Sequence, residues 1–312
     1  MLEYLFCVRP VLLLPWHRTP PTPRASEIHR VIDLLIDNLI NIRDDKGEFL
    51  LHLKDGRTIQ AKCWNGWEWT HGIGLYGVWK FYEITGQAKY LKIIEDWFAE
   101  RFAEGGTTKN INTMTGNLTY LPWLDAWGEW AMHELPRTKY GGMQHITYVA
   151  ENVQELWDDT LMMTVMPLAK IRKLLNRPGY IAEAKRQCLI HNEGHGNGGH
   201  NFADARWARG NSWCTIVIPE ILELLELEPN DAIRTHLCDT LEAQCEALQQ
   251  SQSVSGAGHT LIDDPDSYLE ASATAGFAYG ILKAVRRRYI GSQYQAMGEK
   301  AISALKDVDE KG

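Results

Sequence analysis

Several marks of specialised protein classes are missing from this sequence of 312 residues. The six cysteines form no CxxC pair and no regular framework, so a disulfide scaffold is excluded. We expect free buried thiols in a reducing, cytoplasmic compartment, and we predict no metal and no cofactor. The net charge of −8 argues against nucleic acid or an anionic membrane as the main partner.

A long apolar run is missing as well. Near the N-terminus, residues 5–8 and 11–14 are apolar, but Arg9 and Pro10 separate them and Glu3 spoils the basic region that a signal peptide needs. Each run is too short to cross a bilayer. The sequence therefore predicts no membrane-spanning segment and no targeting signal.

Prolines gather in one place, with four of them in residues 15–24, which is typical of an extended arm. The rest of the chain is long enough to bury a large core. We therefore predict an N-terminal arm over residues 1–25 and a single domain over residues 26–312.

Strand signals are scarce, whereas helical patterns recur throughout the chain. Short turns of Gly, Pro or Asn are repeatedly followed by a tyrosine and an amphipathic helix, at Tyr90, Tyr120, Tyr180 and Tyr294. A mostly apolar helix precedes each of these turns. Helices that are apolar all round are buried, and amphipathic helices bury one face. The alternation therefore predicts an all-α fold, a toroid of inner and outer helices.

The spacing of these units is uneven. The interval from Tyr90 to Tyr120 is half of that from Tyr120 to Tyr180, which is too short for two helices and their loops. Six outer-type helices are expected, but the sequence offers four inner-type partners, starting near Trp69, Leu156, Asn211 and Tyr268. We expect one inner helix to be missing near residues 110–116 and another at the end of the chain.

Two adjacent carboxylates, Asp158 and Asp159, follow Trp157 and precede the apolar run of residues 161–168. Burial disfavours the charged form of a carboxyl group, and this is how a general acid is kept protonated near neutral pH. The alternative is that one of them caps the helix, as Asp often does. We expect one carboxylate to cap and the other to act in chemistry.

Three stretches combine aromatic residues with Asp, His or Arg at the start of an inner helix. They are residues 67–72, residues 143–145 followed by 157–159, and residues 201–213. The starts of all inner helices meet at one end of a toroid, so these groups are predicted to converge on one pocket. The twelve tryptophans of the chain supply stacking surfaces that suit sugar rings.

Each stretch also has a structural interpretation. Trp67 is better explained by packing, and His71 is equally well explained as a histidine at the start of a helix, satisfied by backbone groups. Arg209 lies between Trp207 and Trp213 and is costly to bury without a partner, which favours binding of a carboxylate by its planar fork. In residues 194–200, rich in Gly and His, a flexible loop is favoured over a metal site.

The motifs WDDTLMM at 157–163 and WARGNSW at 207–213 together resemble glycoside hydrolase family 105, the unsaturated rhamnogalacturonyl hydrolases. The stretches WTHGIGLYG at 69–77 and GGMQH at 141–145 fit the same family. The resemblance runs from about Val31 to Ala301. It implies an (α/α)6 barrel, here with one or two inner helices missing, and an enzyme that removes an unsaturated uronic acid from pectin-derived oligosaccharides.

By this resemblance Asp159 is the general acid, which protonates the carbon–carbon double bond of the unsaturated sugar. Water then adds at the adjacent carbon, and the product opens and releases the rest of the saccharide. The resemblance assigns substrate binding to the side chains that follow: Trp69, His71, Asn112, His145, Trp157, Met163, Trp207, Arg209 and Trp213. Arg209 or His145 is expected near the substrate carboxylate.

The chain departs from the family pattern in three places: after Asn112, between Ile190 and Asn201, and at the last inner helix. These departures favour a second hypothesis, a degenerate relative with residual sugar binding and no chemistry. A third hypothesis is an inverting glycosidase in which Glu68 or Asp204 serves as base to Asp159. The sequence leaves the saccharide, its linkage and the oligomeric state open.

Overall fold

The computed structural model describes residues 23–118, 124–192 and 205–305. Within these ranges the chain forms eleven α-helices, and its strands are confined to two short antiparallel pairs. It divides into two compact units, Met1–Trp127 and Gly128–Gly312, with the boundary inside α5 (Leu124–His133). Each unit is described by itself. The all-α class predicted from the sequence is confirmed.

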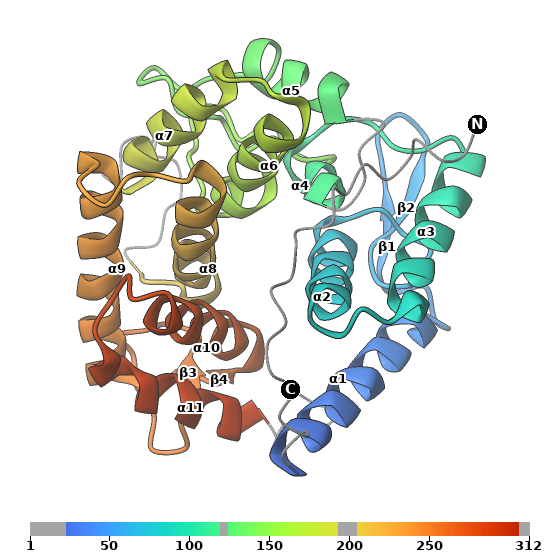
Figure 1. The fold of residues 1–312 in the computed structure, drawn as a ribbon. Helices are drawn as coiled ribbons and strands as arrows, with labels where there is room; N and C mark the ends of the chain where they lie inside the picture. Colours follow the sequence, from blue (N-terminus) through green and yellow to red (C-terminus); the bar gives the residue numbers. More distant parts are fainter. Residues whose placement is uncertain (1–22, 119–123, 193–204, 306–312) are drawn as a thin grey trace. The chain divides into compact units, whose positions relative to one another are not determined.

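The first unit contains three long helices, one short helix and a hairpin (Figure 1). Its elements are α1 (Pro23–Asn41), β1 (Leu50–His52), β2 (Thr58–Gln60), α2 (Trp69–Thr85), α3 (Ala88–Ala103), α4 (Ile111–Met114) and the 3-10 turn η1 (Thr115–Leu118), followed by the start of α5. α2 and α3 pack side by side, joined by a turn in which Gly86 takes the left-handed conformation (φ 66°) that suits glycine.

Aromatic packing forms the core of the first unit. The buried residues of α3 recur at Tyr90, Ile94, Trp97 and Phe98, which is one helical face. Trp67 packs against this face, with its ring centroid 5.1 Å from that of Trp97. Its indole N–H also donates to the Thr113 carbonyl at 3.1 Å. The structural interpretation of Trp67 is therefore confirmed.

The second unit carries the remaining elements. They are the π-helix η2 (Leu161–Val165), α6 (Met166–Leu175), α7 (Gly179–Asn192), α8 (Ala208–Leu225), α9 (Ala232–Ser251), β3 (Gly258–His259), β4 (Leu269–Glu270), α10 (Ala271–Arg286), the 3-10 turn η3 (Ser292–Tyr294) and α11 (Gln295–Ala304). α8 and α10 lie side by side and are joined by a buried ion pair between Glu220 and Lys283.

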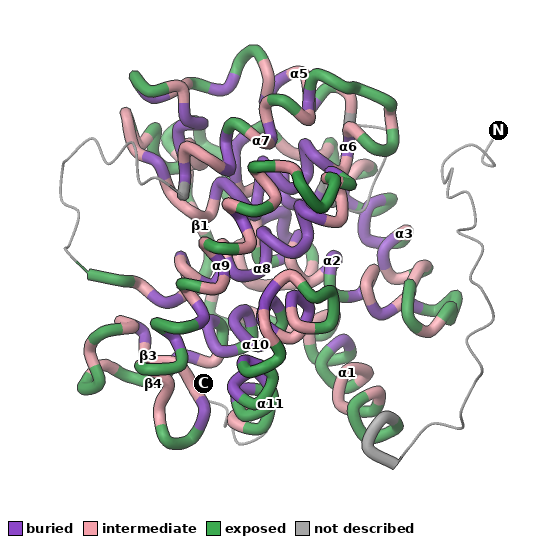
Figure 2. Tube along the Cα trace, turned by 60° about the vertical axis from the view of Figure 1, so that its left-hand side comes forward, coloured by how far each residue is buried: buried purple, intermediate pink, exposed green. Residues whose placement is uncertain are grey.

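The alternation of buried and half-exposed helices follows the sequence pattern. Figure 2 shows α8 mostly as buried residues, whereas α1 is mostly exposed or intermediate. α9 is amphipathic and begins at Asp231, whose side chain accepts hydrogen bonds from the Ile233 and Arg234 amides. An Asp at this position satisfies donors that the first turn leaves unpaired.

The inner helix predicted to be missing near residues 110–116 is represented by the four residues of α4 and the four of η1.

α1 begins at Pro23, so residues 23–25 are helical and the predicted extended arm is wrong for them. The fixed φ of proline suits the first turn of a helix. Residues 1–22, the Gly/His-rich residues 194–200 and residues 306–312 lie outside the described residues.

Candidate active site

The two adjacent carboxylates lie at the start of η2. The Thr160 amide donates to the Trp157 carbonyl at 3.0 Å, and the Leu161 amide donates to the Asp158 carbonyl at 3.0 Å, so the chain turns directly into the buried run. Within the described chain Thr160 holds the N-cap position of η2, and no side chain caps it. Asp159 and Thr160 are themselves helical, so the helix begins before η2, and capping by Asp158 stays a prediction. π-turns inside helices often mark functional sites.

Asp159 is half-buried and contacts the first turns of α8. Its Oδ1 accepts a hydrogen bond from Trp213 Nε1 at 3.2 Å. Burial raises the pKa of Asp159 above its usual range, and the Trp213 hydrogen bond and the positive charge of Arg209 oppose this without cancelling it. The geometry therefore provides a carboxyl group that keeps its proton to higher pH than a surface aspartate, as a general acid requires.

Asp158 lies in the same buried surroundings. Burial, together with the charge of Asp159, raises the pKa of Asp158 to about 6, while a hydrogen bond from the Cys214 thiol acts in the opposite direction. Trp213 and Cys214, consecutive on α8, thus contact Asp159 and Asp158, consecutive before η2. Two neighbouring carboxyl groups that resist simultaneous ionisation behave as a coupled pair.

Arg209 lies in the first turn of α8 with defined neighbours. Its guanidinium carbon is 4.3 Å from the centroid of the Trp207 ring, and its Nη1 is 3.1 Å from Glu270 Oε1. About a third of the Arg209 side chain (34%) reaches solvent, whereas Glu270 is buried. Arg209 therefore stacks on Trp207, and Glu270 is the partner that its partial burial requires; a carboxylate ligand at Arg209 stays a prediction.

His145 stacks face to face on Trp157, with ring centroids 4.5 Å apart and an interplanar angle of 1°. Its Nδ1 is 2.9 Å from Thr160 Oγ1, and burial lowers its pKa to about 3. His145 is therefore neutral at physiological pH. It offers a hydrogen bond and a flat ring face, and not a positive charge.

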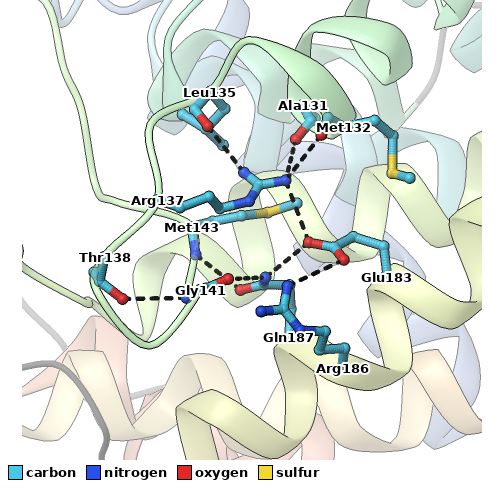
Figure 3. A network of polar contacts seen from close by, with 11 residues as sticks. Ala131, Met132, Leu135, Arg137, Thr138, Gly141, Met143, Glu183, Arg186 and Gln187 are labelled. Carbon is cyan, nitrogen blue, oxygen red and sulfur yellow. Dashed lines mark hydrogen bonds and ion pairs between the residues drawn. The ribbon is translucent and has the colours of Figure 1, made fainter.

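The turn that carries His145 is fixed to α7 by a polar network, drawn in Figure 3. Buried Gln187 accepts from the Met143 amide at 2.8 Å and donates to the Gly141 carbonyl at 2.9 Å and to Glu183 at 2.8 Å. Arg137 donates to the same Glu183 carboxylate at 3.2 Å. These hydrogen bonds fix the backbone at Gly141 and Met143 and so define the conformation of the GGMQH turn, which ends at His145.

The residues predicted in the first unit form a group of their own. Glu68 caps α2 and accepts from the Trp69 amide at 3.3 Å and from Asn112 Nδ2 at 3.0 Å. Burial raises the pKa of Glu68, and these hydrogen bonds oppose the shift. Trp69, the first residue of α2, is partly buried.

Both ring nitrogens of His71 contact backbone groups. Nδ1 accepts from the Glu68 amide at 3.2 Å, and Nε2 lies 2.7 Å from the Cys63 carbonyl, which requires the Nε2–H tautomer. Burial lowers the pKa of His71, consistent with a neutral ring. This geometry favours the structural alternative for His71, in which it fixes the loop before α2.

Two features of the described residues bear on other functions. No helix within the described ranges is long and apolar enough to cross a membrane. Nor do three His, Cys, Asp or Glu side chains of residues 23–118, 124–192 and 205–305 come together as metal ligands. The cysteines that the structure describes (Cys63, Cys188, Cys214, Cys238 and Cys245) are free thiols.

Comparison with known proteins identifies the family. A family model described as Glycosyl Hydrolase Family 88 matches residues 41–312. A solved structure from Salmonella enterica serovar Paratyphi A, described as a possible member of the GH105 family, is 55% identical and has a TM-score of 0.89. The match covers 97% of this chain and 88% of that chain. The chain belongs to glycoside hydrolase family 105.

Two further relatives support this family assignment. A GH105 structure from Klebsiella pneumoniae, described in the same way, is 54% identical with a TM-score of 0.89 and covers 98% of this chain and 88% of that chain. The unsaturated rhamnogalacturonyl hydrolase YesR from Bacillus subtilis is 29% identical over 285 residues, which are 82% of this chain and 80% of the relative. GH105 and GH88 proteins have the (α/α)6 toroid fold, which confirms the predicted fold class.

Within the second unit, the structure links six of the residues predicted for a GH105 site through two sets of contacts. His145 stacks on Trp157, and Asp159 contacts Trp213 while Arg209 lies over Trp207. Met163 is in η2 with 1% of its surface exposed, so it is part of the packed core, and its role as a substrate contact stays a prediction. Trp69, His71 and Asn112 belong to the first unit.

Sequence reasoning missed Glu270, Cys214 and Gln187. Each acts through a partner far along the chain, and nothing in the local sequence marks it. Of the bases considered for an inverting glycosidase, Asp204 lies outside the described residues and Glu68 caps α2 in the first unit.

Proposed function

We propose that this GH105 protein is a hydrolase that removes an unsaturated uronic acid from the non-reducing end of rhamnogalacturonan-derived oligosaccharides. The observation that carries the proposal is the half-buried Asp159 carboxyl, whose pKa is raised by desolvation and which lies beside Arg209 and Trp213. YesR, named as an unsaturated rhamnogalacturonyl hydrolase, supports the choice of substrate class.

The proposed chemistry starts with protonation of the C4=C5 double bond by the Asp159 carboxyl. The electron pair of the double bond forms the new C4–H bond, and positive charge develops at C5 and the ring oxygen. The Asp159 carboxylate left behind stabilises this charge. Water adds at C5 and gives a proton back to the Asp159 carboxylate, and the hemiketal formed opens and releases the remaining saccharide.

The other residues bind and orient the substrate. Arg209 contacts the uronate carboxylate, since a guanidinium matches a carboxylate with two parallel hydrogen bonds. Trp207 and Trp213 supply stacking surfaces beside it. His145 and Trp157, the first residue of the WDDTLMM motif, form a stacked pair. Trp69, His71, Asn112 and Met163 stay in the proposal as predicted contacts, and a cytoplasmic location stays part of it.

A degenerate relative that binds sugar without chemistry is the second candidate. The observation that favours it is the short α4, four residues where the toroid pattern calls for a full inner helix.

A continuous absorbance assay tests the proposal, because hydration removes the double bond conjugated with the carboxylate. The purified protein is incubated with an unsaturated rhamnogalacturonan disaccharide, and Asp159→Asn is expected to lower the rate by at least about 10²-fold, the usual loss for a general acid. Asp239→Asn, an exposed aspartate on α9, serves as the matched control.

Two results would overturn the proposal. Activity that survives Asp159→Asn means that another group is the acid. No activity in protein shown by circular dichroism to be folded favours the degenerate relative, and binding of the same disaccharide then measures what function is left.

A further inference from the structure

A hairpin ahead of α10 holds the start of α8. β3 pairs with β4, and the segment between them contacts the residues before and at the start of α8. The Ala208 amide donates to the Thr260 carbonyl at 2.8 Å, and the Ile262 amide donates to the Arg206 carbonyl at 2.9 Å. These bonds continue a sheet-like contact in which Trp207 pairs with Leu261. The hairpin therefore places the N-terminus of α10 beside Arg209.

Glu270, the last residue of β4, is where this hairpin contacts the Arg209 side chain. Its Oε1 accepts from Arg209 Nη1 at 3.1 Å and from Ser272 Oγ at 2.5 Å. Its Oε2 accepts from Thr260 Oγ1 at 2.9 Å. With 7% of its surface exposed, the carboxylate cannot turn away without leaving these donors unpaired inside the protein.

Two contacts of different kinds, a ring contact and a hydrogen bond, fix the orientation of the Arg209 guanidinium. The Trp207 ring, 4.3 Å away, sets the plane of the fork, and Glu270 sets its rotation within that plane. Recognition of a carboxylate by arginine depends on this orientation, because the two parallel hydrogen bonds form in one geometry. An arginine with the same charge and no fixed orientation attracts anions and aligns them poorly.

We propose that Glu270 is the positioning residue that orients Arg209 and thereby gives the site its preference for a sugar carboxylate over a neutral group. The proposal rests on the proposed function, in which Arg209 contacts the uronate. Glu270 does not touch the substrate in this account. It acts through the direction of the Arg209 fork, with Thr260 and Ser272 holding it in place.

The test measures equilibrium binding and needs no turnover. Tryptophan fluorescence is titrated in an Asp159→Asn parent with two probes, an unsaturated galacturonyl disaccharide and its uncharged methyl ester. The parent is expected to prefer the acid by about tenfold, the contribution of one charge-assisted hydrogen-bonded contact. Adding Glu270→Ala is expected to reduce this preference to below about threefold. Glu270→Gln is expected to retain most of it, because the amide oxygen can accept from Arg209 in the same position.

A control variant separates positioning from general loosening of the fold. Glu223→Gln removes a carboxylate on α8 that pairs with Lys283 of α10 at 2.5 Å, away from Arg209. It is expected to leave the preference for the acid unchanged. The proposal is overturned if Glu270→Ala weakens both probes equally, or if Glu223→Gln changes the preference as much. A parent that prefers neither probe refutes the role of Arg209 itself, which is a failure of the proposed function and is seen before Glu270 is altered.

Discussion

Replacing Asp158 by Asn is expected to stabilise the protein at neutral pH and to have little effect in acid. The pKa of Asp158 is raised from 3.8 to about 6, so the folded state binds its proton more tightly than the unfolded state does. This group therefore favours folding below pH 3.8, and its contribution is lost as the pH rises to 6. Above that pH the folded protein contains a buried carboxylate that the unfolded chain would expose to water.

The size of the effect follows from the shift. A difference of about 2 pKa units corresponds to about 3 kcal/mol at pH 7, and most of this is absent at pH 4. Asn keeps an oxygen that accepts from the Cys214 thiol, and any cost of burying the amide is the same at both pH values. The gain in unfolding free energy from Asp158→Asn is therefore expected to be about 2 kcal/mol larger at pH 7 than at pH 4.

Urea denaturation followed by tryptophan fluorescence at the two pH values measures this difference. The exposed Asp239→Asn is the control and is expected to show no such dependence on pH. An Asp158→Asn variant whose change in stability is equal at pH 7 and pH 4 would refute the reasoning. A variant that is selectively destabilised at pH 7 would show that ionised Asp158 forms a favourable contact.

Two further changes test the surroundings of the site. Trp213→Phe removes the hydrogen bond from Trp213 to Asp159 Oδ1, and this bond favours the charged form of Asp159. Its loss raises the Asp159 pKa, so the alkaline limb of the pH–rate profile is expected to move to higher pH by up to about 1 unit. A limb that stays in place, or moves down, would remove Trp213 from the control of Asp159. Gln187→Leu leaves the Met143 amide and the Gly141 carbonyl unpaired inside the protein and is expected to cost about 2–4 kcal/mol of unfolding free energy in a urea titration. A loss below about 0.5 kcal/mol would mean that other groups satisfy these atoms.

The part of the site that local sequence could predict is the part made of neighbours along the chain. Asp159 was identifiable because a carboxylate before an apolar run must be paired or used, and Arg209 because an arginine between tryptophans needs a partner. The identity of that partner, Glu270, was not predictable, since it depends on which hairpin comes to lie beside α8. His71 illustrates the opposite limit. Its position at the start of α2 suited a ligand contact and a backbone contact equally, and atomic distances were needed to favour the second.

The helix pattern was predictable for a different reason. Burial on all sides leaves a nearly continuous apolar run in the sequence, and burial on one side leaves an amphipathic period; α8 and α9 show the two cases. The π-turn η2 leaves no such mark, because it inserts within a helical run without changing its composition. The helical run begins at Asp159, ahead of η2, and the side chains of Asp159 and Asp158 contact Trp213 and Cys214 of α8.

The first two turns of α8 concentrate the tuning of the proposed acid. Arg209, Trp213 and Cys214 all lie there. Trp213 donates a hydrogen bond to Asp159, Cys214 donates one to Asp158, and the positive charge of Arg209 acts on Asp159. Positive charge and hydrogen-bond donors lower a carboxyl pKa, whereas burial and a like charge raise it, so the proton on Asp159 is held by a balance set across one helix contact. A displacement of α8 would alter the hydrogen bonds to the carboxyl groups and their burial together. The hairpin that fixes Trp207 and Glu270 to this helix therefore matters for acidity as well as for carboxylate recognition, and the two properties are expected to fail together when the hairpin is loosened.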